Sequence, residues 1–169
     1  MTRRLILLRH AKSSWSDTSM PDHDRVLNGR GRRAATAVGR WLAEKGYRPD
    51  QVLCSPAVRT RETWQRISDE LPDAPQATLI PGLYLGEPVD LFDALTKATG
   101  RCVALLAHNP GIGDFAGRIL AAAPDHPDFR RYPTLATLVA DFPIDDWSAL
   151  EFGTGQAVDF VVPRALTDG

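Results

Sequence analysis

The chain has 169 residues, a length typical of one domain, and we expect residues 1–169 to fold as a single unit. Hydrophobic residues make up 43% and charged residues 24%, which is typical of a folded globular protein and excludes a disordered one. The 20 basic and 21 acidic residues nearly cancel, so no binding to nucleic acid or to a membrane is expected. No apolar run is long enough for a membrane span or a signal-peptide core, which predicts a cytoplasmic location.

Cysteine usage limits the possible cofactors. The two cysteines, Cys54 and Cys102, each lie in an apolar run, which is typical of buried reduced thiols. Two distant cysteines supply too few ligands for a metal site. We therefore expect neither a metal nor another cofactor.

Short apolar runs alternate with amphipathic stretches, which is the pattern of an α/β fold with a mostly parallel sheet. Residues 5–8 are continuously apolar and predict a strand buried on both faces. A polar loop follows at 13–28, and residues 31–45 carry apolar side chains at helical spacing. Residues 51–54 predict a second strand. The Ser-Pro pair at 55–56 resembles an N-cap followed by a proline at the first helical position, so a helix is expected to begin there.

The second half of the chain continues the alternation. Residues 77–85 are expected to be extended or irregular, and Pro88 is suited to begin a helix. The later expected elements are a strand at 102–107, a helix at 112–123, a loop at 124–134, and strands at 137–142, 147–152 and 157–162. We therefore predict a three-layer sandwich, in which helices flank a central, mostly parallel sheet.

Polar side chains follow three of the predicted strands at the point where each strand ends. Arg9 and His10 follow the first strand, Ser55 follows the second, and His108 follows the strand at 102–107. Arg59 lies in the first turn of the helix expected after Ser55. Because ligands of open α/β sheets bind outside the carboxyl ends of the strands, we expect these side chains to meet at one edge of the sheet.

The chemistry of this set points to phosphate. Guanidinium groups match phosphate oxygens, and a neutral imidazole can attack phosphorus. Positive charge on Arg9 and Arg59 is expected to disfavour protonation of His10 and to keep its ring neutral. The sequence contains neither a paired-aspartate motif beside a strand end nor a Gly-x-x-x-x-Gly-Lys-Ser/Thr loop, so metal-dependent and nucleotide-cradling mechanisms have little support.

Three motifs together resemble the histidine phosphatase superfamily, in the branch that includes the phosphoglycerate mutases. They read LLRHA at 7–11, SPAVRT at 55–60 and HNPG at 108–111, and the likeness extends over about residues 4–162. The short chain and the segment DHDRVLNGRG at 22–31 resemble the SixA-type phosphohistidine phosphatases most. The resemblance implies a phosphoglycerate mutase-like fold, no cofactor and a phosphohistidine enzyme intermediate. It implies His10 as the nucleophile and a phosphate pocket formed by Arg9, Arg59 and His108.

The same resemblance suggests further contacts with the substrate. Asp22 and Arg25 are expected at the rim of the pocket, and Ser55 and Asn109 are counted as substrate-binding candidates. Trp15 follows His10 closely and could line the pocket. Ala11 departs from the usual Arg-His-Gly motif, so the backbone there must tolerate a methyl group.

A second departure concerns the proton donor to the leaving group. Many superfamily members carry an acid in the middle of the chain, but here Tyr84 lies near the expected position and Glu87 is displaced. Asp22, Glu87 or solvent could supply the proton. Because a protonated imidazole leaves more readily than an alkoxide, the lack of a dedicated acid favours a phosphohistidine substrate.

The sequence therefore predicts a metal-independent phosphatase. Its predicted partner is a phosphorylated protein, either a histidine phosphotransfer domain or a phosphocarrier. A phosphomonoesterase for a small phosphate ester is the first alternative, and a non-catalytic phosphate-binding module is the second.

Overall fold

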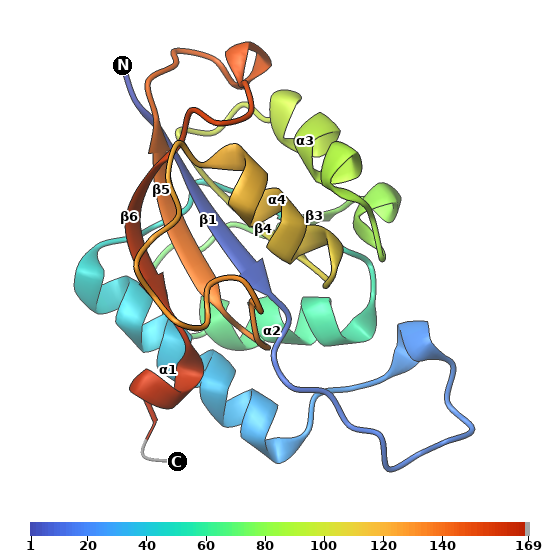
Figure 1. The fold of residues 1–169 in the computed structure, drawn as a ribbon. Coiled ribbons are helices and arrows are strands. Elements are labelled where there is room, and N and C mark those ends of the chain that lie inside the picture. The colour runs from blue at the N-terminus through green and yellow to red at the C-terminus, as the bar shows by residue number, and fades with distance from the viewer. Residues whose placement is uncertain (168–169) are drawn as a thin grey trace.

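The computed structural model describes residues 1–167 and contains one six-stranded sheet with helices on both faces (Figure 1). The strands are β1 (Arg3–Arg9), β2 (Gln51–Cys54), β3 (Ala77–Leu79), β4 (Cys102–Ala107), β5 (Thr137–Phe142) and β6 (Gln156–Val161). The helices are α1 (Gly29–Lys45), α2 (Val58–Ser68), α3 (Pro88–Thr96) and α4 (Gly111–Ile119). No helix within residues 1–167 is long and apolar enough to cross a membrane.

The strand order is β3-β2-β4-β1-β5-β6. The pairs β2–β3, β2–β4 and β1–β4 are parallel, whereas β5 pairs antiparallel with both β1 and β6. The sheet is thus mostly parallel, with an antiparallel edge. The predicted three-layer α/β architecture is confirmed.

The middle of β1 is buried on both faces of the sheet, as its continuous apolar run predicts. Leu5 and Leu7 pack in the core beneath α3 and α4, while Ile6 and Leu8 pack in the core beneath α1 and α2. All four side chains are fully inaccessible to solvent. Two hydrophobic cores therefore hold β1 in place and fix the position of the residues that follow it.

Three neighbouring parallel strands end together at one edge of the sheet. Arg9 of β1 lies opposite Ala107 of β4, and Cys54 of β2 lies opposite Leu106 of β4. In Figure 1 this edge is where the arrowhead of β1 leads into the loop toward α1. The residues that directly follow these strands are consequently brought side by side.

Two predicted helix starts are shifted in the structure. Helix α1 begins at Gly29 instead of 31, because the Asn28 side chain accepts a hydrogen bond from the Gly31 N–H at 2.8 Å and caps the helix. Helix α2 begins at Val58, so the prediction of a helix start at residues 55–56 is wrong. The Ser55 N–H instead donates to the Leu106 carbonyl at 3.0 Å and so extends the pairing of β2 with β4.

Two predictions in the second half are also corrected. Helix α4 ends at Ile119 instead of 123, because Leu120 forms a β-bridge with Gly155 that helical backbone cannot make. Residues 147–152 do not form a strand. Trp147–Ala149 is a 3-10 turn capped by Asp146, and it buries the Trp147 ring against the Phe142 ring.

Candidate active site

The backbone at His10 and Ala11 is held by hydrogen bonds to three other segments. The His10 N–H donates to the Ala107 carbonyl at 3.2 Å, and the His10 carbonyl accepts from the Leu135 N–H at 3.0 Å. The next residue, Ala11, donates its N–H to the Thr63 hydroxyl of α2 at 2.9 Å. Ala11 is fully buried and is not among the residues with a positive φ, so this position does not require glycine.

A backbone carbonyl fixes the orientation of the His10 ring. Its Nδ1 lies 2.7 Å from the Ala11 carbonyl oxygen, which can only accept a hydrogen bond. Nδ1 of the neutral ring must therefore carry the proton, and the lone pair resides on Nε2. Burial, assisted by the charges of Arg9, Arg59 and Arg25 and opposed by the hydrogen bond to the Ala11 carbonyl, lowers the pKa of His10 to about 4. The ring is consequently neutral near pH 7.

Two guanidinium groups flank this ring. Arg59, in the first turn of α2, is 2% exposed and donates to the Asp22 carbonyl at 2.7 Å and to Asp22 Oδ2 at 3.0 Å. Arg9, the last residue of β1, donates from Nη1 to the Tyr132 carbonyl at 3.2 Å. Burial and the nearby charge of Arg59 lower the pKa of Arg9. Two like charges held together and partly buried are a costly arrangement that a bound anion would offset.

His108 directly follows β4 and completes the cluster. Its ring centroid lies 5.2 Å from that of His10, and its Nε2 lies 2.7 Å from the Ser55 hydroxyl oxygen. Burial, followed by the proximity of His10 and Arg59, lowers the pKa of His108 to about 3. Ser55 itself is fully buried and does not line the pocket, so its expected contact with substrate is corrected: its hydroxyl holds the His108 ring.

Within the described chain, three buried side-chain nitrogens have no hydrogen-bond partner in the protein. They are Arg9 Nε, Arg59 Nε and His108 Nδ1. A buried polar nitrogen without a partner costs stability, so native structures contain few of them. That all three belong to this one cluster indicates a site built to bind acceptor oxygens from outside the chain.

Asp22 links the loop before α1 to the cluster. Its carboxylate accepts from Tyr84 at 2.6 Å, from Arg59 at 3.0 Å and from Arg25 at 3.1 Å. The Tyr84 hydrogen bond, together with Arg59 and Arg25, outweighs the opposing effect of burial and holds the pKa of Asp22 well below its usual range. Asp22 is therefore ionised at neutral pH. In the sequence, only the position of Tyr84 near the expected acid pointed to a place in the site.

Arg25 lies at the rim of the cluster, as expected. Its guanidinium stacks 3.6 Å from the centre of the Trp15 ring and donates to the Ser13 hydroxyl. Trp15 is 72% exposed and lines the pocket together with His10. This stack orders part of the long loop between β1 and α1.

Two other candidates have structural partners. Glu87 lies outside the pocket and caps α3: its carboxylate accepts from the Asp90 N–H, and Asp90 bonds back to the Glu87 N–H at 2.8 Å. Asn109 lines the pocket, but its amide nitrogen donates to the carbonyls of Arg131 and Tyr132, and its oxygen accepts from Gly113. Neither side chain has a polar group aimed at a ligand.

The pocket over the cluster has a volume of about 380 Å³. Its lining includes residues that sequence reasoning did not assign to the site, among them Lys12, Leu85 and Thr134. Lys12 lies two residues after His10, and this spacing is the one signal that could have found it. Within residues 1–167, no group of three or more His, Cys, Asp and Glu side chains is arranged to hold a metal ion.

Comparison with known proteins identifies the family. A model of the histidine phosphatase superfamily (branch 1) matches residues 5–83. An uncharacterized protein of Mycobacterium tuberculosis is 31% identical over 166 residues, which covers 93% of this chain and 100% of the relative. An uncharacterized chloroplastic protein of Arabidopsis thaliana is 43% identical over 86 residues, but the alignment covers 50% of this chain and only 39% of that relative.

A solved structure extends the likeness over the whole fold. A protein of Agrobacterium tumefaciens, described as a candidate phosphohistidine phosphatase SixA, is 26% identical with a TM-score of 0.79. The superposition covers 95% of this chain and 98% of that one. The chain belongs to the histidine phosphatase superfamily and has its phosphoglycerate mutase-like fold, as the sequence motifs predict.

Proposed function

We propose that this protein is a phosphohistidine phosphatase that carries the phosphoryl group on His10 Nε2 during turnover. The observation that carries the proposal is the convergence of a neutral His10 ring with three unpartnered buried nitrogens, Arg9 Nε, Arg59 Nε and His108 Nδ1. A nucleophile surrounded by donors for phosphoryl oxygens is the arrangement that phosphoryl transfer requires.

In the first step, the lone pair on His10 Nε2 attacks phosphorus opposite the leaving group. The bond from Nε2 to phosphorus forms as the bond from phosphorus to the leaving nitrogen breaks. The electron pair stays on that nitrogen, and the leaving imidazole, protonated by solvent on its other nitrogen, departs as a neutral ring. Arg9, Arg59 and His108 bind the equatorial oxygens, where negative charge is spread in the transition state. The proton on His10 Nδ1 remains bonded to the Ala11 carbonyl, which stabilises the positive charge that develops on the ring.

In the second step, water attacks the phosphorus of phospho-His10. The bond to Nε2 breaks, its electron pair returns to the ring, and inorganic phosphate departs with the oxygen of water. His10 is regenerated in its neutral form with the proton still on Nδ1. This chemistry asks for no metal ion, and turnover is expected to persist in excess EDTA.

The choice of substrate rests on the missing acid. An alkoxide needs a proton from a neutral acid as it leaves, which contributes about 10²- to 10⁴-fold to the rate. Asp22 is held ionised by Tyr84 and the arginines, and Glu87 is bound at the start of α3. An imidazole protonated by solvent needs no such acid. The site is therefore better suited to phosphohistidine than to an alcohol phosphate.

The comparisons support the same substrate class, because the structural relative from Agrobacterium tumefaciens carries the description of a phosphohistidine phosphatase. We propose a phosphorylated histidine on a signalling or phosphocarrier protein as the target. The second candidate is a phosphomonoesterase for a small phosphate ester. The Tyr84 hydroxyl favours it, since this group lies at the site and bears a proton that a leaving oxygen could accept.

The decisive test is to trap the phosphorylated enzyme. Wild-type protein mixed with a ³²P-labelled phosphohistidine peptide is expected to yield an acid-labile, base-stable label on His10. His10→Ala is expected to lose both the label and turnover, whereas His126→Ala, which removes a histidine outside the pocket, keeps both. Retained turnover in His10→Ala contradicts the nucleophile assignment. Faster turnover of a phosphoserine peptide than of the phosphohistidine peptide favours the second candidate.

A further inference from the structure

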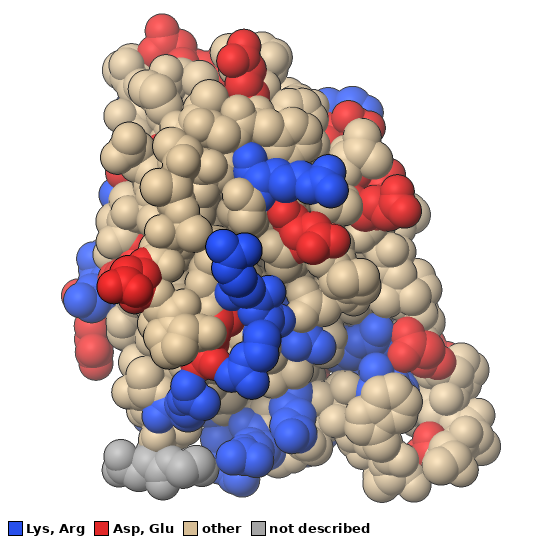
Figure 2. Space-filling model, viewed as in Figure 1, with Lys and Arg blue, Asp and Glu red and all other residues tan. Residues whose placement is uncertain are grey.

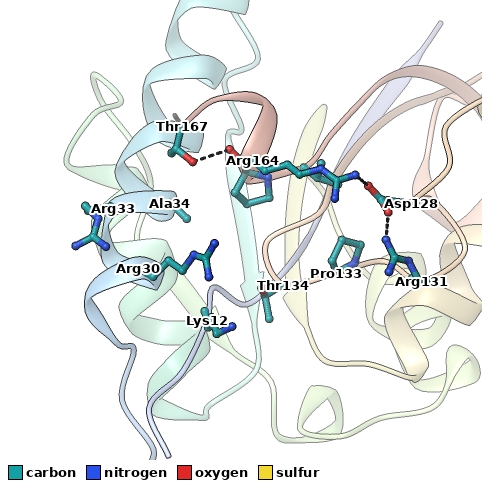
Figure 3. A pocket seen from close by; sticks show the side chains of 12 residues that line it. Lys12, Arg30, Arg33, Ala34, Asp128, Arg131, Pro133, Thr134, Arg164 and Thr167 are labelled. Carbon is teal, nitrogen blue, oxygen red and sulfur yellow. Dashed lines mark hydrogen bonds and ion pairs between the residues drawn. The ribbon is translucent and has the colours of Figure 1, made fainter. Parts of the chain in front are cut away.

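A second hollow adjoins the active-site pocket. It has a volume of about 530 Å³ and lies between the start of α1, the loop at 128–134 and the C-terminal turn at 163–167 (Figure 3). Lys12 and Thr134 line both hollows, so the two lie next to each other. We call this second hollow the basic groove and define it by five side chains: Lys12, Arg30, Arg33, Arg131 and Arg164.

Part of the groove is held in place by a buried carboxylate. Asp128 is 2% exposed and forms ion pairs with Arg131 and with Arg164, as Figure 3 shows. One carboxylate thus positions two exposed guanidinium groups from segments more than thirty residues apart in the sequence. Their remaining donors are left for another partner.

The other three cations of the groove have no such partner. Within the described residues, Lys12, Arg30 and Arg33 take part in none of the ion pairs or side-chain hydrogen bonds. Figure 3 shows Arg30 reaching from α1 toward the space beside Lys12, with Arg33 at the outer edge.

The placement of these charges opposes local stability. Arg30 lies in the first turn of α1, where the helix dipole is positive, and this turn contains no acidic residue. Figure 2 shows Lys and Arg gathered on the lower part of the face, although the net charge of the chain is only −1. A concentration of unpaired like charges in a nearly neutral protein is explained if an anionic partner binds there.

The exposure of the groove indicates the size of that partner. All five basic residues are exposed, in contrast to the buried Arg59 and His108 of the active-site pocket. Small-ligand sites enclose most of the ligand with a few converging polar groups, which the groove does not do. Exposed charges on an open surface are suited to several weak contacts with a protein.

We propose that the basic groove binds an acidic segment next to the phosphohistidine of the partner protein. The proposal rests on the proposed function and adds a specificity determinant to it. The phosphoryl group occupies the pocket over His10 while Asp or Glu side chains of the same partner contact Arg30, Arg33 and their neighbours. The groove then selects among phosphohistidine proteins by the charge around their phosphorylated residue.

The test compares two synthetic phosphohistidine peptides of equal length. In one the phosphohistidine is flanked by glutamates, and in the other by glutamines at the same positions. At low ionic strength we expect wild-type kcat/KM to be about tenfold higher for the glutamate peptide, because several exposed ion pairs of modest strength add together. The preference should shrink toward physiological ionic strength, because exposed charges are screened.

Arg30→Gln/Arg33→Gln is the test variant. We expect it to lose the preference for the glutamate peptide while its kcat/KM for the glutamine peptide stays within about twofold of wild type. Lys45→Gln/Arg48→Gln is the matched control, because it removes the same net charge near the other end of α1 and also from exposed positions. The control is expected to keep the preference.

The outcomes separate this proposal from the proposed function. Equal kcat/KM for both peptides in wild type, or a preference that survives in the test variant, overturns the acidic-segment proposal while phosphohistidine turnover stands. Turnover of neither peptide overturns the proposed function itself. Fructose 1,6-bisphosphate provides a third arm: if wild type but not the test variant prefers it to fructose 6-phosphate, the groove binds a small polyanion and the acidic-segment proposal is wrong.

Discussion

The active-site pocket and the basic groove contain the same kinds of side chain in opposite surroundings. Arg59 is 2% exposed, bonds twice to Asp22 and leaves Nε without a partner in the protein. Arg33, on the adjoining helix α1, is exposed and makes no ion pair within the described residues. The two hollows meet at Lys12 and Thr134, yet water reaches one set of charges and is largely excluded from the other.

The contrast shows that burial gives arginines in the two regions different properties. A charge in a site of low dielectric acts strongly on a neighbouring group and is weakly screened by salt. An exposed charge acts weakly on neighbouring groups, but its desolvation cost is small and several such charges can act together on one partner. The buried arginines are therefore suited to stabilising a transition state, and the exposed ones to choosing and orienting a partner.

The largest expected effect is on kcat/KM, and it tests the difference between buried and exposed arginines directly. Arg59→Gln is expected to lower kcat/KM for free phosphohistidine by about 10²- to 10³-fold, because it removes a fixed donor to the phosphoryl oxygens. Arg33→Gln should leave the same quantity within about twofold, since its charge is exposed. Steady-state kinetics of both variants provides the measurement. Similar losses in the two would show that burial does not distinguish the two regions.

An effect of intermediate size is expected in the pH dependence of the free energy of unfolding, which tests the burial of the two active-site histidines. The pKa values of His10 and His108 are lowered from 6.5 to about 4 and about 3. Between these values and 6.5 the unfolded chain binds more protons than the folded one. The free energy of unfolding should therefore be unaffected by these rings above 6.5 and fall as the pH drops, by about 1.4 kcal/mol per pH unit for each ring.

Urea unfolding at several pH values measures this slope, and NMR of the imidazole protons reports which ring titrates. His10→Gln is expected to remove the contribution of one ring and so to flatten the slope. A His10 ring that titrates near its usual value of 6.5 in the folded protein would contradict the account of a buried neutral nucleophile.

The smallest expected effect concerns Glu87, which lies outside both hollows. Glu87→Ala removes the cap of α3 and is expected to cost about 0.5–2 kcal/mol of stability, as other N-cap losses do. Its kcat should remain close to that of wild type, because the side chain does not reach the pocket. Thermal unfolding and steady-state kinetics test the two statements separately. A large loss of kcat in this variant would identify Glu87 as the proton donor after all.

Local patterns were sufficient for most of the sheet. Continuous apolar runs marked β1 and β4, and the polar residues directly after them were placed at the correct edge. The errors arose where distant segments compete with local preference. The alanines after Ile119 favour helix, but Leu120 pairs with Gly155 instead. Similarly, Ser55 resembles a helix cap, but its N–H extends the pairing of β2 with β4.

The sequence alone was enough to identify the strand ends at which the polar residues meet, because burial of apolar runs and the positions of polar side chains are local properties. Only the tertiary structure decided that Asp22 is held ionised, that Glu87 caps a helix and that Ser55 holds His108. The basic groove is another feature that only the tertiary structure shows. Asp128 joins Arg131 to Arg164 across more than thirty residues, and no local pattern encodes a pairing that depends on where the folded chain returns.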